Sequence, residues 1–355
     1  YENYGLSLIG GSVAVFYFAT WAGCQYYGLM GQEPAFVLMI LTTTLAMVLA
    51  VHHDALGLAI LGVVGGFLTP ILLSTGVDNQ IVLMTYMGVL NGGIFWVSLN
   101  KRWVALNWLG FAATFLLYFA WLAGFHDCAK FWPSLFFLNL YTVGFVVIPY
   151  IHDQGREEEQ TISGAHLAVI ASIAGLILNI FLISDCYNLE AASLASLSYT
   201  VLFAALAQAL YQSGREEYQS FALYVCQSAL FLAVSIPILL DGEWVTVLLA
   251  AQAAALYYLS GKLSLRILLI GGMALMGFVM AKFLVYDYGE LYKVFGGQSL
   301  SQATGHGARM LSNLAILAGL FLMGWWSEGT PIRDERVRRN LAAIHYVAFG
   351  SMLFL

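Results

Sequence analysis

Apolar runs of about 20 residues follow one another along almost the whole chain, and this feature constrains the fold most strongly. A helix that crosses about 30 Å of hydrocarbon needs roughly 20 apolar residues. Twelve such spans and a partial thirteenth are predicted, at about residues 5–28, 34–51, 55–73, 80–98, 103–124, 131–150, 163–183, 192–212, 219–240, 243–260, 264–285 and 308–326, with the partial span from 341. A membrane β-barrel would instead alternate polar and apolar residues in segments of about ten. The sequence therefore predicts an all-α, polytopic transmembrane helical bundle.

Composition excludes both a soluble domain and a disordered chain. Of the 355 residues, 61% are hydrophobic and 10% are charged, whereas a soluble domain has about 25% charged residues. Aromatic residues make up 15% of the chain, and disordered chains contain few of them. The net charge of −6 argues against a basic surface for nucleic acid.

The predicted organisation has three parts. Residues 1–326 form the transmembrane helical bundle, residues 327–340 a charged cytoplasmic hinge, and residues 341–355 the start of a further transmembrane helix. Because the chain has no initiator Met and ends inside a short apolar run, we expect it to be a fragment of a longer protein.

The distribution of basic residues predicts the orientation. Ten of the 14 Lys and Arg residues fall in alternate loops on one side of the predicted spans, and the other four fall on the opposite side. Cytoplasmic loops carry the excess of Lys and Arg. We therefore expect the Tyr1 end to be cytoplasmic.

Two cysteines lie just outside predicted spans on the side expected to be external. An oxidising compartment permits a disulfide between Cys128 and Cys186, and two free thiols are the alternative. A metal site that also uses His126, Asp127 and Asp185 would lack the paired ligand spacing of zinc sites. We expect no metal and no other cofactor.

The predicted spans contain essentially no ionisable side chain near their centres, which argues against ion-coupled transport through acidic residues. They do contain amides and hydroxyls, which form hydrogen bonds between helices or line a polar cavity. The candidates for such a cavity are Thr42, Thr43, Thr44 and Asn91, which precedes two glycines.

The third span has a face of small residues, because Ala55, Ala59, Gly62 and Gly66 are spaced by four, three and four. Another helix can approach closely along such a face. The proline that follows predicts a kink or break near the outer leaflet. The residues expected to serve packing or the kink are Ala55, Ala59, Gly62, Gly65, Gly66, Thr69 and Pro70.

This span also carries a family resemblance. The run from Ala55 to Gly76, ALGLAILGVVGGFLTPILLSTG, resembles the predicted bacterial membrane proteins grouped as domain of unknown function 2339. His53-Asp54 before the run is similar to the same family, as are the later Tyr86, Leu90-Asn91, Arg102-Trp103 and Leu106-Asn107. The close resemblance covers roughly residues 1–125. It implies a multi-pass protein of the bacterial inner membrane and assigns no catalytic residue.

Few residues suggest chemistry. The chain has no Walker loop, no His-Glu-x-x-His and no Gly-x-Ser-x-Gly motif. Asp78, Asp127 and Asp287 are the external carboxylates that a transferase acting on a lipid carrier would need, but none has a second recognisable catalytic group beside it. The arginines expected to contact anionic lipid head groups are Arg333, Arg336, Arg338 and Arg339.

The leading functional hypothesis is a non-catalytic scaffold or accessory subunit that packs with partner subunits and lipids in a bacterial envelope complex. The first alternative is an uncoupled carrier or flippase for lipid-linked or weakly charged solutes. The second alternative is a membrane-embedded transferase. The expected partners are membrane lipids and other membrane protein subunits, with no nucleic acid.

Overall fold

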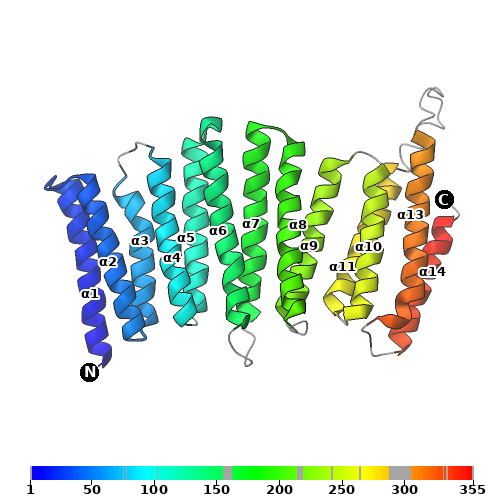
Figure 1. The fold of residues 1–355 in the computed structure, drawn as a ribbon, viewed down its shortest axis with the longest axis horizontal. Coiled ribbons are helices and arrows are strands. Elements are labelled where there is room, and N and C mark those ends of the chain that lie inside the picture. The colour runs from blue at the N-terminus through cyan, green and yellow to red at the C-terminus, as the bar shows by residue number, and fades with distance from the viewer. Residues whose placement is uncertain are drawn as a thin grey trace. The chain divides into compact units, whose positions relative to one another are not determined.

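The computed structural model describes residues 2–74, 76, 78–101, 103–154, 162–213, 219–240, 243–263, 265–287, 305–330, 332 and 335–353. Within these residues every regular element is a helix, and no strand occurs (Figure 1). The predicted all-α class is therefore confirmed.

Ten described helices are long and apolar enough to cross a membrane. Two shorter apolar helices, Leu56–Leu72 and Leu311–Trp325, coincide with the third and twelfth predicted spans. The structure thus confirms a multi-pass helical protein, with ten long spans and two short ones at the places predicted for twelve.

The chain divides into two compact units, Tyr1–Cys186 and Tyr187–Leu355, which are called unit 1 and unit 2 below. The α-helices of unit 1 are α1 (Glu2–Trp21), α2 (Gln32–His52), α3 (Leu56–Leu72), α4 (Gln80–Asn100), α5 (Val104–Phe125), α6 (Phe131–Gln154) and α7 (Ile162–Cys186). Those of unit 2 are α8 (Leu189–Gln212), α9 (Gln219–Leu239), α10 (Glu243–Leu263), α11 (Arg266–Lys282), α13 (Gly305–Trp325) and α14 (Glu335–Leu353). Short π- and 3-10 segments extend the helices at Ala22–Tyr26, Cys128–Lys130, Phe283–Asp287 and Trp326–Gly329.

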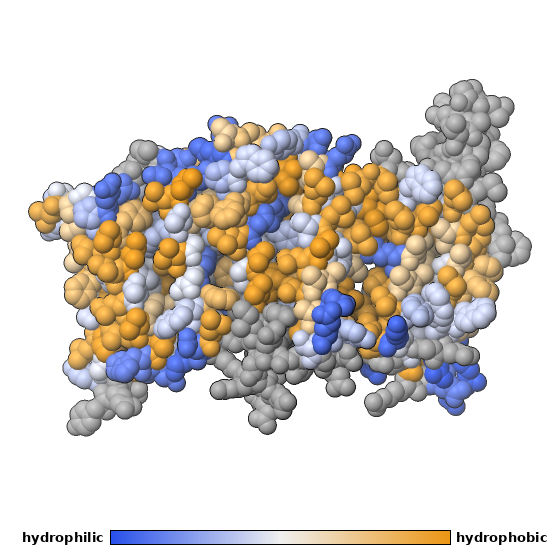
Figure 2. All heavy atoms as spheres, viewed as in Figure 1, coloured by the Kyte–Doolittle hydropathy of each residue, from blue (hydrophilic) through white to orange (hydrophobic). Residues whose placement is uncertain are grey.

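The helices of unit 1 run alternately up and down, so its connections gather at two ends. The connections after α1, α3 and α5 and the end of α7 lie at one end, and the connections after α2 and α4 lie at the other (Figure 1). Hydrophobic side chains cover most of the visible surface of unit 1 between hydrophilic side chains at its two ends (Figure 2). This is the distribution expected of a helical unit surrounded by lipid.

Three glycines of α3 lie against side chains from neighbouring helices. A Cβ atom added at Gly65 would lie 2.4 Å from Cε2 of Tyr17 on α1, and one at Gly62 would lie 3.2 Å from Cβ of Ala46 on α2. A Cβ at Gly66 would lie 3.1 Å from side-chain atoms of α2 and α4. Hydrogen atoms in place of methyl groups therefore let α1, α2 and α4 approach the backbone of α3.

Pro70 lies inside α3, which continues for two more residues and ends at Leu72. A proline has no N–H, so the carbonyl oxygen of residue i−4, here Gly66, loses its usual helical donor. The hydroxyl of Tyr86 on α4 donates a hydrogen bond to this carbonyl at 2.6 Å. A side chain of the next helix thus supplies the hydrogen bond that the proline removes.

The C-terminal helix begins earlier than the sequence predicts. The expected hinge over residues 327–340 is helical from Glu335 onward, because α14 spans Glu335–Leu353. An acidic residue in the first helical turn interacts favourably with the positive end of the helix dipole, and arginines are good helix formers. These local preferences account for the helix in place of the hinge. Glu335–Leu353 is not among the apolar helices long enough to cross a membrane within the described residues.

We expect Gly65→Ala to lower the free energy of unfolding by about 1–3 kcal/mol, because the added methyl group collides with a buried Tyr17 ring. Reversible unfolding in mixed detergent micelles, followed by tryptophan fluorescence, measures the change. Gly93→Ala on α4 is the matched control, because nothing lies within 4 Å of the added Cβ. The control should be neutral or slightly stabilising. Equal effects of the two substitutions would contradict this account of the α3 glycines.

A double-mutant cycle tests the Tyr86 hydrogen bond. Tyr86→Phe removes the donor to Gly66 and should cost about 1–2 kcal/mol, because a buried carbonyl loses its partner. In a Pro70→Ala background the alanine N–H can donate to the same carbonyl, so Tyr86→Phe should cost clearly less there. The same unfolding assay gives all four free energies. Identical costs in the two backgrounds would show that Tyr86 does not compensate for the proline.

Candidate functional site

A cluster of polar and ionisable side chains lies at one end of unit 1. This end, called the disulfide end below, is formed by the α3–α4 loop, the α5–α6 connection and the C-terminus of α7 (Figure 1). It contains an ion pair, several hydrogen bonds to backbone and side chains, and a disulfide.

Asp78 in the α3–α4 loop forms the ion pair. Its carboxylate lies 2.7 Å from Nζ of Lys130 and accepts a hydrogen bond of 2.7 Å from Nε1 of Trp121 on α5. Lys130 also donates to the carbonyl oxygen of Phe125 at 3.1 Å. The side chain of Asp78 is only 17% exposed, and its contacts tie the α3–α4 loop to α5 and to the end of the α5–α6 connection.

The electrostatic surroundings of Asp78 favour the carboxylate. Partial burial alone would raise its pKa, but the hydrogen bonds from Lys130 and Trp121 and the charge of Lys130 bring the pKa below the usual value. Such a carboxylate is a poor general acid near neutral pH. The geometry therefore gives Asp78 a structural role as the partner of Lys130.

Gln80, the first residue of α4, extends this polar cluster to α6. Its side-chain amide donates to Oγ of Ser134 at 2.7 Å. The carbonyl oxygen of Ser134 in turn accepts a hydrogen bond of 3.0 Å from the hydroxyl of Tyr118 on α5. Gln80, Ser134 and Tyr118 are all buried, so α4, α5 and α6 are joined by polar contacts beneath the loops.

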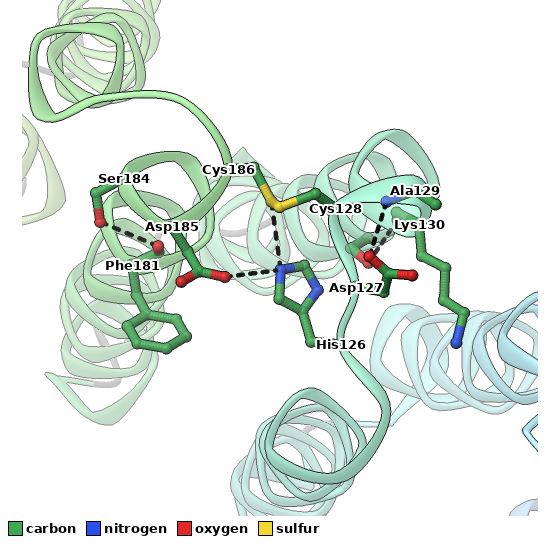
Figure 3. Close-up of a disulfide and its surroundings, with 10 residues drawn as sticks. His126, Asp127, Cys128, Ala129, Lys130, Phe181, Ser184, Asp185 and Cys186 are labelled. Carbon is green, nitrogen blue, oxygen red and sulfur yellow. Dashed lines mark hydrogen bonds and ion pairs between the residues drawn. A yellow bond between two sulfur atoms is a disulfide. The ribbon is translucent and has the colours of Figure 1, made fainter.

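A disulfide joins the α5–α6 connection to the end of α7. Cys128 and Cys186 are bonded, with a distance of 5.4 Å between their Cα atoms. His126 lies beside this bond, with Nε2 3.6 Å from Sγ of Cys186 and 3.6 Å from Oδ2 of Asp185 (Figure 3). Asp127 instead accepts a hydrogen bond from the backbone N–H of Ala129.

Five residues at this place were candidates for a metal site from the sequence, and the structure brings four of them close together. Ligand atoms of His126, Cys128, Asp185 and Cys186 all lie within 4.8 Å of one another. The spacing of these residues along the sequence does not match a zinc motif, because they come from two segments that meet only in the folded chain. Asp127 instead caps the N-terminus of the 3-10 turn Cys128–Lys130, which follows it in the chain.

The candidates for a polar cavity make local or helix-to-helix hydrogen bonds. The hydroxyls of Thr42, Thr43 and Thr44 each donate to the carbonyl of the residue four positions earlier. Thr43 also lies 2.6 Å from the hydroxyl of Tyr17. Oδ1 of Asn91 accepts a hydrogen bond from Thr114 on α5, whereas its Nδ2 is buried and has no hydrogen-bond partner among the described residues.

The predicted lipid-binding arginines lie at the start of α14. Arg336 and Arg339 are exposed and Arg338 is half-buried, all within the first turns of this helix. Arg333 lies outside the described residues. The third candidate carboxylate, Asp287, falls in the π-helical segment Phe283–Asp287, and its side chain lies outside the described part of the structure.

Unit 2 contains an open cavity of about 440 Å³ between α8, α9 and α10. Its lining is mostly apolar and includes Ala207, Phe221, Val225 and Leu256. Gln252 is among its few polar residues. The amide nitrogen of Gln252 donates to the carbonyl of Ala229, and its Oε1 is buried with no partner in the part of the chain that the structure describes.

Sequence reasoning overlooked the tyrosines that join helices in unit 1. Tyr17, Tyr86, Tyr118 and Tyr141 each donate to a backbone carbonyl of another helix. Tyrosine is apolar along most of its length, so a hydropathy search counts it with the lipid-facing residues. The glycine face of α3 is a signal for Tyr17 and Tyr86, whose acceptors are the carbonyls of Gly62 and Gly66. The acceptors of Tyr118 and Tyr141 belong to Ser134 and Met84, which carry no such signal.

The fold and the polar cluster at one end define a multi-pass helical membrane protein, in which ionisable groups lie near helix ends and hydrogen bonds join the spans. More specifically, the chain belongs to the family described as predicted membrane protein (DUF2339), whose model matches residues 1–264. The match includes all of unit 1 and continues through α10, well beyond the first 125 residues where the resemblance is plainest. Comparisons with curated proteins and with solved structures found no match.

We expect Asp78→Asn to destabilise the protein near neutral pH by about 1–2 kcal/mol, because it removes a charge-assisted hydrogen bond and leaves Lys130 unpaired. The pKa of Asp78 is lowered by folding, so its contribution is complete above the unfolded value of about 3.9. The contribution is lost as the pH falls through the folded pKa. The stability difference between wild type and variant should therefore shrink at acidic pH.

Unfolding midpoints in detergent between neutral pH and about pH 3 test this expectation. Asp54→Asn is the control, because the Asp54–Lys101 pair at the opposite end of unit 1 is more exposed, at 68% for the aspartate. The Asp54→Asn substitution should lower the free energy of unfolding by less than about 0.5 kcal/mol. A difference for Asp78→Asn that stays constant with pH would contradict the assigned ion pair.

Proposed function

We propose that this protein is a non-catalytic scaffold or accessory subunit that packs with partner subunits and lipids in a bacterial cytoplasmic membrane. The Tyr1 end lies in the cytoplasm in this proposal, as the excess of basic residues in alternate loops favours. The disulfide end of unit 1 then faces the outside.

The proposal rests on one observation: polar side chains of the predicted membrane spans in unit 1 form hydrogen bonds between helices. Amides and hydroxyls of different helices bond to each other or to a neighbouring backbone. The pairs are Tyr17 with Thr43, Tyr86 with Gly66, Ser98 with Asn107, Asn91 with Thr114, Asn139 with Asn179, and Gln80 with Ser134.

These pairs favour a structural role, because the side chains that transport or catalysis would require are already bonded to other parts of the protein. A carrier for polar solutes needs hydrogen-bonding groups that face a shared path across the membrane. A transferase needs an acid or base that can reach a substrate. In unit 1 the hydroxyl of Thr43 contacts Tyr17, and the carboxylate of Asp78 contacts Lys130.

The face of α4 offers a place where a partner helix could pack. Gly92 and Gly93 are exposed in the middle of this helix, and a Cβ at either would meet nothing within 4 Å. Glycine disfavours helix formation by up to about 1 kcal/mol per residue. Close approach of another membrane helix offsets this cost, because small residues let two backbones pack together. Val89 and Trp96, both exposed, flank the glycines.

The cavity in unit 2 favours one second candidate, the carriage of a lipid-linked solute. Its apolar lining and open side suit an acyl chain, and the unpaired Oε1 of Gln252 could accept a hydrogen bond from a polar group attached to the chain. The same lining also fits a lipid that fills a surface depression without being transported.

Native mass spectrometry of the protein, extracted gently from its own membrane, tests the proposal. We expect a stoichiometric complex with at least one further membrane subunit. Gly92→Leu should dissociate this complex, because the added side chain blocks close approach along α4. Ala112→Leu on the exposed face of α5 serves as a control for added bulk and should leave the complex intact.

The outcome that contradicts the scaffold is a lone chain in wild-type membranes. A lone chain that retains one lipid, and loses it in a Gln252→Leu variant, would favour the second candidate instead. Unfolding of each variant in detergent separates loss of a partner from loss of the fold.

A further inference from the structure

Four side chains of the types that bind zinc converge beside the disulfide of unit 1. His126 and Cys128 come from the connection between α5 and α6, and Asp185 and Cys186 are the last two residues of α7 (Figure 3). One ligand atom from each lies within 4.8 Å of every other. Two sulfurs, an imidazole nitrogen and a carboxylate oxygen form a ligand set that Zn²⁺ accepts.

The distances from His126 fit the edges of a zinc tetrahedron. With Zn–S bonds of about 2.3 Å and Zn–N and Zn–O bonds of about 2.0 Å, a tetrahedral site separates nitrogen from sulfur by about 3.5 Å and nitrogen from oxygen by about 3.3 Å. In the structure, Nε2 of His126 lies 3.6 Å from Sγ of Cys186 and 3.6 Å from Oδ2 of Asp185. Two edges of the tetrahedron are therefore nearly in place.

The imidazole of His126 also lacks a strong hydrogen bond. Its side chain is only 8% exposed, and the distance to Asp185 exceeds that of a hydrogen bond. Sulfur is a weak acceptor, and Nδ1 is buried with no partner in the described residues. Burying an imidazole in this way costs free energy, and a cation bound to Nε2 would offset the part of this cost that belongs to Nε2.

We infer that His126, Cys128, Asp185 and Cys186 form a tetrahedral Zn²⁺ site when the Cys128–Cys186 disulfide is reduced. A dithiol reductant transfers two electrons and two protons, so the S–S bond breaks, two thiols form, and the dithiol itself becomes a disulfide. Zn²⁺ then displaces one proton from each thiol to solvent as two Zn–S bonds form. The neutral imidazole and the carboxylate complete the site.

A site with four protein ligands has no open position for a substrate, which is typical of structural zinc. Asp185 is 55% exposed, so the ion can enter from solvent. In either redox state the α5–α6 connection remains joined to the end of α7, by the disulfide or by the metal. The site would thus preserve this link in a chain whose thiols have not been oxidised.

Cobalt titration of the full chain in detergent tests the site. Cys24→Ser and Cys226→Ser first remove the two other cysteines, which are free. The protein is reduced with a phosphine, because a dithiol would itself bind metal, and Co²⁺ is then added under argon. We expect one equivalent to bind with thiolate-to-cobalt charge-transfer absorption and tetrahedral d–d bands, and Zn²⁺ to displace it. The oxidised protein should show neither band.

Single substitutions separate this site from adventitious binding. Cys128→Ser or Cys186→Ser should weaken the charge-transfer band, and His126→Ala or Asp185→Asn should lower Co²⁺ affinity by more than about tenfold. Asp127→Asn is the matched control, because this neighbouring carboxylate bonds to the backbone of Ala129 and should leave the affinity unchanged.

Two results would overturn the inference. One is a reduced wild-type protein, with a full count of thiols and its helical circular dichroism retained, that shows no thiolate-to-cobalt band. The other is a band that survives unchanged in both Cys128→Ser and Cys186→Ser. The first result compares the oxidised with the reduced protein and needs no substitution at the four ligands. The test therefore remains decisive even if a ligand variant misfolds.

Discussion

The rest of unit 1 depends on one constraint, that backbone polar groups inside hydrocarbon must find partners within the protein. Pro70 breaks this condition for the carbonyl of Gly66, and Tyr86 restores it from α4. Gly66 has no side chain to hold α4 away, and a Cβ there would lie 3.1 Å from the side chain of Leu90 on α4. The three residues therefore act together. Pro70 removes a hydrogen-bond donor, Gly66 leaves room for α4, and Tyr86 supplies the new donor.

The same combination of close approach and polar contact recurs around α3. The ring of Tyr17 packs over Gly65, and its hydroxyl reaches both Thr43 and the carbonyl of Gly62. Van der Waals packing and hydrogen bonds drive association between membrane helices, because lipid tails are as apolar as the helices themselves. The helices α1, α2 and α4 thus all pack against the face of small residues on α3.

The disulfide end differs from this interior because hydrophilic side chains gather there (Figure 2). Ion pairs and charged side chains are tolerated there, and the partly buried pair of Asp78 and Lys130 joins loops rather than spans. The disulfide adds a covalent link between segments that are 58 residues apart. This end holds the one group in the described residues whose ligand atoms are arranged for a metal, and the group includes a histidine that lacks a strong partner.

Hydropathy and helix length determined the class of fold from sequence, because each span must bury its own backbone hydrogen bonds and therefore has a local signature. The small face of α3 could also be recognised locally, from the spacing of its glycines. The sequence could not assign Tyr17 to Gly65 or Tyr86 to Gly66, because each pair joins residues whose proximity depends on how helices pack. It also misplaced the start of α14, where local helix preference extended the helix into an expected hinge. Hydrophobicity is a property of single segments and can be read along the chain, whereas hydrogen-bond partners and ligand sets are properties of pairs that only the tertiary structure brings together.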